Sequence, residues 1–72
     1  MRWAKITGAN IRRLRLERGL TQEDLAGEAG IAMRHVGRIE RGESSPTVDL
    51  LGKLAAVLGV HPQALLEDTA DQ

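Results

Sequence analysis

TQEDLAGEAGIAMRHVGRIER, residues Thr21 to Arg41, is the stretch of sequence that decides the fold. Thr21 is a good N-cap for a helix, and Asp24, three residues later, completes a near capping box. Gly30 stops this helix, and a second helix of similar length is predicted over about 32–41. Two short helices joined by so tight a turn must cross steeply, which predicts a helix-turn-helix over residues 21–41.

Five positions in this stretch hold the residue type that such a helix pair needs. Ala26 is small where the two helices approach most closely, and Gly30 allows the positive φ of the turn. Ile31 fills the core from within the turn, while Val36 and Ile39, three residues apart, form the buried pair of the second helix. A single match arises easily by chance, but five in register, with helix caps beside them, favour the helix-turn-helix.

Further helices are predicted on both sides of this pair. Thr7 is expected to cap a first helix over about 8–18, and Trp3, the only aromatic residue, to pack as a lid over one edge of the core. Thr47 caps a fourth helix, and Pro62 begins a short fifth one, where its missing N–H costs nothing. No segment alternates with period two for long enough to predict a strand. The expected fold is therefore all-α, with five helices.

Size and composition limit the function. With 72 residues the chain has room for one domain, predicted over 1–72 with its core at 7–66. Cysteine is absent, and His35 and His61 are far apart without an acidic cluster, so neither a metal site nor a cofactor is predicted. No paired carboxylates, nucleophile–base set or phosphate loop indicates an enzyme. No apolar stretch approaches the roughly 20 residues of a bilayer span, so a cytoplasmic protein without membrane contact is expected.

The net charge is zero, which by itself argues against a nucleic-acid-binding protein. The charges are distributed unevenly, however. Residues 1–41 contain nine of the ten basic residues and five acids, a balance of +4. Residues 42–72 contain one lysine and five acids, a balance of −4. The molecule should therefore have one basic end, which a polyanion would meet first.

A set of residues spread over about 8–66 matches the pattern of a known family. The set comprises Gly19-Leu20-Thr21-Gln22, Leu25-Ala26, Gly30, Val36-Gly37-Arg38-Ile39-Glu40-Arg41-Gly42, Pro46, Leu54-Ala55 and Leu58-Gly59-Val60. In these residues the chain resembles the lambda-repressor-like (Cro/xenobiotic-response-element type) transcriptional regulators. The resemblance implies a compact five-helix domain that binds operator DNA as a dimer. The helix over 32–41 would be the recognition helix and would enter the major groove.

The resemblance also implies which side chains read DNA bases. Met33, Arg34 and Arg38 match the positions whose side chains meet base edges, and they share the helix face opposite the buried pair. An arginine there binds guanine O6 and N7 with two hydrogen bonds, worth about 1–3 kcal/mol of discrimination between bases. Met33 offers only apolar contact, for instance to a thymine methyl group.

Three further residues are expected near DNA phosphates: Gln22, His35 and Arg41. Gln22 stands at the start of the second helix, where backbone N–H groups favour an anion. Arg41 stands at the end of the recognition helix. The resemblance further implies a salt bridge between Arg15 and Glu40, which would tie the first helix to the end of the recognition helix.

Two positions of the recognition helix depart from the family pattern. Ala32 stands where the family usually has serine or threonine, so the helix lacks a side-chain N-cap, at a cost of about 1 kcal/mol. Gly37 lies in mid-helix and costs about 1 kcal/mol relative to alanine. We therefore expect this helix to be loose until DNA or a neighbouring subunit holds it.

The sequence thus predicts specific binding of double-stranded DNA by a homodimer on a two-fold operator. Half-sites one helical turn apart, about 34 Å, are the geometric expectation. Such a regulator would act as a repressor or controller, by blocking a promoter or by contacting RNA polymerase or another partner protein. The alternative is a protein-interaction module, such as an antitoxin-like partner, that keeps the fold with weak or no DNA binding. The acidic half of the chain and the missing cap leave this alternative open.

Overall fold

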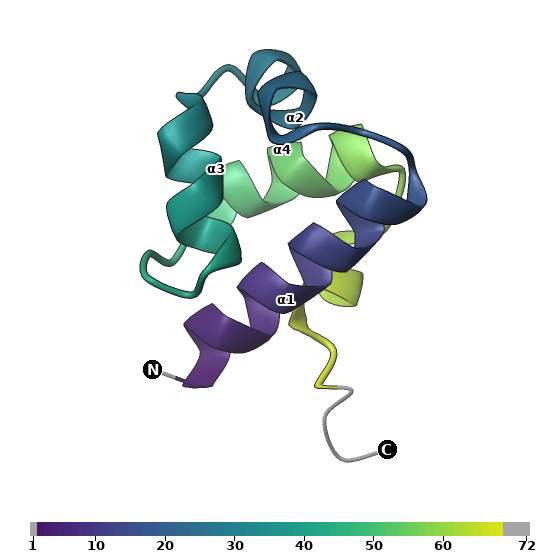
Figure 1. Cartoon of the computed structure of the whole chain (residues 1–72). Coiled ribbons are helices and arrows are strands. Elements are labelled where there is room, and N and C mark those ends of the chain that lie inside the picture. The colour runs from purple at the N-terminus through teal and green to yellow at the C-terminus, as the bar shows by residue number, and fades with distance from the viewer. Residues whose placement is uncertain (1, 69–72) are drawn as a thin grey trace.

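The computed structural model describes residues 2–68, a range that contains four α-helices, one 3-10 turn and no strand (Figure 1). The elements are α1 (Arg2–Glu17), α2 (Gln22–Ala29), α3 (Met33–Glu40), α4 (Val48–Leu58) and the 3-10 turn η1 (Pro62–Leu66). The predicted all-α fold class is confirmed. Residues 1 and 69–72, which the predicted domain includes, lie outside the described range.

The fifth predicted helix is a 3-10 turn, so the expected count of five α-helices is wrong. Pro62 opens this turn, as predicted, but the turn is only five residues long. Its end is held by α1, because the buried side chain of Asn10 donates hydrogen bonds to the carbonyls of Leu65 (3.0 Å) and Glu67 (2.9 Å). These bonds satisfy carbonyl groups that a further helical turn would otherwise use.

The predicted starts of α2 and α4 are confirmed. Thr21 and Asp24 form a full capping box, since each backbone N–H donates to the other side chain at 2.9 Å. Thr47 caps α4 by accepting a hydrogen bond from the N–H of Leu50 at 3.1 Å. Gly30 has a φ of 73°, so the turn from α2 to α3 needs the glycine that stands there.

The predicted start of α1 is wrong by more than one turn. The helix begins at Arg2, and Thr7 lies buried inside it instead of capping it. The reason is a buried stripe with helical spacing that starts at Ala4 and continues to Ile11, since burial of this stripe favours helix ahead of the expected cap. Trp3 is not a lid: its residue is 56% exposed, and the guanidinium of Arg2 lies 5.2 Å from the centre of its ring.

One core joins all five elements. Its seven largest fully buried side chains are Ile11 of α1, Leu25 of α2, Val36 and Ile39 of α3, Leu54 and Leu58 of α4, and Leu65 of η1. Gly8 lets α1 approach the end of α3, because a Cβ at Gly8 would overlap the carbonyl oxygen of Ile39. α3 lies at the edge of the helix cluster, between α2 and the first turns of α1 (Figure 1).

Candidate nucleic-acid interface

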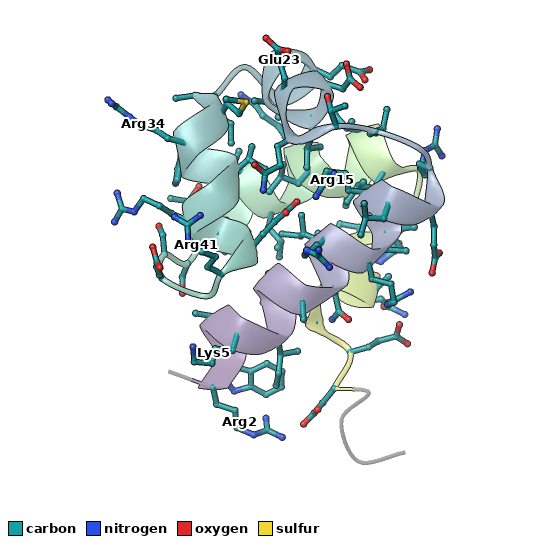
Figure 2. All side chains as sticks on the ribbon, in the orientation of Figure 1. Arg2, Lys5, Arg15, Glu23, Arg34 and Arg41 are labelled. Atoms are coloured by element: carbon teal, nitrogen blue, oxygen red, sulfur yellow. The ribbon has the colours of Figure 1, made fainter. Side chains whose placement is uncertain are left out.

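α3 has one buried face and one exposed face. Val36 and Ile39 are each 1% exposed, which confirms them as the residues that anchor the helix in the core. Met33, at 53% exposed, and the exposed Arg34 and Arg38 lie on the outer side. Arg34 extends away from the body of the molecule (Figure 2). The three residues predicted to contact bases are therefore accessible together on one helix.

The start of α3 depends on backbone hydrogen bonds. Ala32 is its N-cap and makes no side-chain capping bond, as the sequence predicted. The carbonyl of Ala32 accepts from the N–H groups of His35 at 3.0 Å and Val36 at 3.3 Å. The His35 side chain is carried on this first turn, and the residue is half-buried.

A buried ion pair joins α1 to the end of α3. Arg15 Nε donates to Glu40 Oε2 at 2.7 Å, and Arg15 Nη2 donates to Glu40 Oε1 at 3.1 Å. The side chains are 9% and 2% exposed. Arg15 Nη1 also donates to the carbonyl of Leu20 at 2.7 Å, in the link between α1 and α2. In Figure 2 the Arg15 side chain points into the space between the helices.

Gln22, predicted to contact a phosphate, is attached to this ion pair. It is the first residue of α2, and its Nε2 donates to Glu40 Oε1 at 3.0 Å. Sequence reasoning did not anticipate this bond. An amide NH2 group has two hydrogens, so one remains for a second acceptor while Glu40 holds the side chain in place.

Arg41 lies just beyond α3, and its guanidinium turns back over Gly37. A Cβ placed on Gly37 would lie 3.1 Å from Arg41 Nη1 and 3.8 Å from Gln22 Oε1. The glycine therefore leaves room for two of the predicted phosphate-contacting side chains to lie side by side. From the sequence, Gly37 was interpreted as a cost to the helix and as a position that could permit close approach to the duplex, but not as room for these two side chains.

Glu43 is a residue of this surface that sequence reasoning missed. Arg41 Nε and Nη2 donate to its two carboxylate oxygens at 3.1 and 3.2 Å. These hydrogen bonds lower the pKa of Glu43 and raise the pKa of Arg41, and the positive charges of Arg38 and Lys5 lower the pKa of Glu43 further. The available signal was the Arg–Gly–Glu sequence at the helix end, where Gly42 turns the chain back.

Two further properties can be stated for residues 2–68. No three side chains of histidine, aspartate or glutamate in that range come together as metal ligands would. None of its helices is long and apolar enough to cross a membrane.

Two arginines of α1 lie on the surface. Arg12 is exposed, and the exposed Arg13 donates to Glu17 at 3.3 Å.

Comparison with known proteins gives matches along most of the chain. Residues 11–65 match a family model described as helix-turn-helix, HTH_3. The HTH-type transcriptional regulator y4dJ of Sinorhizobium fredii, itself uncharacterised, is 42% identical over 65 residues, which cover 90% of this chain and 84% of that protein. The chain spans only 32% to 56% of the length of three other regulators that it matches.

Solved structures of two regulators have the same arrangement of helices. The restriction-modification controller protein C.AhdI from Aeromonas hydrophila superposes with a TM-score of 0.83 at 35% identity, over 86% of this chain and 94% of that one. SinR, a master regulator for biofilm formation solved in complex with DNA, superposes with a TM-score of 0.80 at 35% identity, over 85% and 98%. The chain belongs to the lambda-repressor-like helix-turn-helix family of transcriptional regulators.

Proposed function

We propose that this chain binds a specific sequence in double-stranded DNA, with α3 in the major groove, and thereby represses or controls transcription. The observation that carries the proposal is the outer face of α3. Arg34 and Arg38 are exposed there, and no hydrogen bond or ion pair within residues 2–68 engages either guanidinium. Five other arginines are bonded to the protein itself: Arg2, Arg13, Arg15, Arg18 and Arg41.

Arg34 and Arg38 are the residues that would read bases. Each guanidinium fork matches O6 and N7 of a guanine in the major groove, at about 1–3 kcal/mol of discrimination per pair. Met33, one turn closer to the start of the helix than Gly37, would add apolar contact to a thymine methyl. The opposite face of this helix is anchored in the core, so the three side chains are directed to the same side of the molecule.

Gln22, His35 and Arg41 would hold the phosphates. Gln22 and Arg41 converge over Gly37 from two different elements, so a single stretch of backbone could meet both. The start of α2 adds the favourable field of a helix N-terminus for an anion. Such contacts fix the register of the protein on the duplex and carry no sequence information themselves.

The relatives support DNA binding, whereas the two-fold arrangement rests on the geometry of the duplex. SinR was solved in complex with DNA, and C.AhdI is a controller of a restriction-modification system. We infer a homodimer that binds two half-sites about 34 Å apart, because a two-fold protein matches a palindrome read one helical turn apart. Contact with RNA polymerase or another protein would decide whether the bound dimer represses or activates.

The test is selection of bound sequences from a random duplex pool, followed by binding of the selected site at several salt concentrations. We expect a two-fold motif and an affinity that falls steeply as salt rises. Arg34→Met and Arg38→Met should each relax the preference at one base position. Arg12→Met is the matched control, since Arg12 is exposed and makes no hydrogen bond or ion pair with the described part of the chain, but lies on α1. If nothing is enriched and binding stays weak at low salt, the proposal fails, and a protein-interaction module replaces it.

A further inference from the structure

Arg41, one of the proposed phosphate contacts, already holds an anion of the protein itself. Its guanidinium donates to both carboxylate oxygens of Glu43, at 3.1 and 3.2 Å. The two side chains are 59% and 54% exposed, so the pair lies on the accessible surface next to α3. A positive φ of 75° at Gly42 brings the two side chains round to the same side.

The Arg41 side chain of this pair lies within the proposed phosphate-binding surface. Its Nη1 lies over Gly37, beside the Gln22 side chain that Glu40 holds in place. The Nε–Nη2 edge, which can hold two oxygens of one oxyanion, faces Glu43. A DNA phosphate arriving between Gln22 and Arg41 would meet a guanidinium whose best edge is occupied.

We propose that Glu43 competes intramolecularly with DNA phosphate for Arg41. The carboxylate offers the same two-oxygen geometry as a phosphate, so either anion satisfies the guanidinium fork. Two-bond contact between a phosphate and the Nε–Nη2 edge then requires Arg41 to release Glu43; otherwise the phosphate is limited to the remaining N–H groups of Arg41. This inference rests on the proposed function. It means that Glu43 weakens DNA binding at the same surface, whatever the DNA sequence.

The restraint acts on the backbone contribution to binding and leaves base reading untouched. Phosphate contacts supply nearly all of the affinity for random DNA. Weakening one of them lowers binding to every sequence by the same factor, whereas contacts from Arg34 and Arg38 distinguish sequences. Glu43 therefore lowers the affinity for all DNA. At a given protein concentration, the fraction of DNA that is bound then depends more on the base contacts.

The test compares wild type with Glu43→Gln on a random-sequence duplex and on the selected duplex, by fluorescence anisotropy at 50–200 mM salt. Glutamine keeps the size and the hydrogen-bonding oxygen but removes the charge. We expect Glu43→Gln to bind both duplexes about fivefold more tightly at the lowest salt, the ratio expected when Arg41 no longer has to give up one unit-charge attraction at contact distance in water. The log–log salt dependence should steepen by up to about 0.9, as one more phosphate is neutralised.

The matched control is Glu17→Gln, because Glu17 forms a comparable exposed pair with Arg13 on α1. It changes the net charge equally but should leave both affinities within experimental error. Glu43→Gln should also lose its gain when it is combined with Arg41→Gln, since the competition acts through Arg41.

Three results would overturn the inference while the proposed function stands: unchanged binding by Glu43→Gln, an equal gain from Glu17→Gln, or a full gain in the Arg41→Gln background. A wild-type chain that binds no duplex even at the lowest salt would instead overturn the proposed function, and this inference with it.

Discussion

Replacing Glu40 with leucine tests how α3 is held. Leucine fills much of the same volume but leaves the Arg15 guanidinium buried without a counter-charge. In the native protein that guanidinium makes two bonds to Glu40 and one to the carbonyl of Leu20, from a side chain only 9% exposed. Only the bond to Leu20 would remain. The variant therefore isolates the penalty of an unpaired buried charge.

The expected loss is about 3–5 kcal/mol, the range found when one partner of a buried ion pair is removed. A chain of 72 residues has a free energy of unfolding of about 4–11 kcal/mol at 0.05–0.15 kcal/mol per residue. Glu40→Leu thus removes about a quarter or more of the free energy of unfolding. The double variant Arg15→Met/Glu40→Leu should be close to wild type or more stable, because no charge is left buried.

Urea unfolding followed by circular dichroism at 222 nm measures the stability of four proteins: wild type, Glu40→Leu, Arg15→Met and the double variant. If Glu40→Leu is too unstable to fold, recovery of folding in the double variant gives the same information. A loss below about 1 kcal/mol in Glu40→Leu would refute the reasoning, since it would mean that water solvates the pair as it does a surface salt bridge. The double variant should still bind DNA more weakly than wild type, because Gln22 has lost the carboxylate that holds it.

Three further variants test local features. Gly37→Ala should stabilise α3 by up to about 1 kcal/mol in urea unfolding, but should weaken binding to all DNA sequences, because its Cβ displaces the Arg41 guanidinium. Asp24→Asn should be less stable than wild type at pH 7; hydrogen bonds from Thr21 hold the pKa of Asp24 below its usual 3.8, so this difference should vanish as the pH falls through that lowered pKa. Gly8→Ala should cost about 1–3 kcal/mol or more in the same unfolding assay, because its Cβ meets backbone of α3 that has nowhere to move.

Local signals explain why the centre of the fold could be predicted from the sequence. The capping box of α2 needs only Thr21 and Asp24, and the turn before α3 needs only a glycine at position 30. The anchors Val36 and Ile39 follow from helical spacing alone. Each of these features is determined within about four residues, so a sequence pattern is sufficient to find it.

The parts that escaped prediction depend on residues far apart in the chain. α1 extends to Arg2 because its first turns bury Ala4, which no cap or breaker signals. Gly8 matters only because the end of α3 comes to lie against it. The bond between Gln22 and Glu40 spans 18 residues and becomes visible only when α2 and α3 are placed together. The spacing of residues along the chain does not predict such long-range contacts.

The expectation of a loose recognition helix rested on two local costs, at Ala32 and Gly37, of about 2 kcal/mol together. The structure adds an opposing interaction at the other end of α3, because any state that separated Glu40 from a still-buried Arg15 would leave that charge unpaired. The destabilising and stabilising features lie at opposite ends of the helix, since the missing cap affects the first turn and the ion pair fixes the last. α3 should therefore open from Met33 and stay closed at Glu40. Amide hydrogens of its first turn should exchange faster than those near Ile39, so that Arg34 would lie on the mobile side of that boundary and Arg38 on the fixed side.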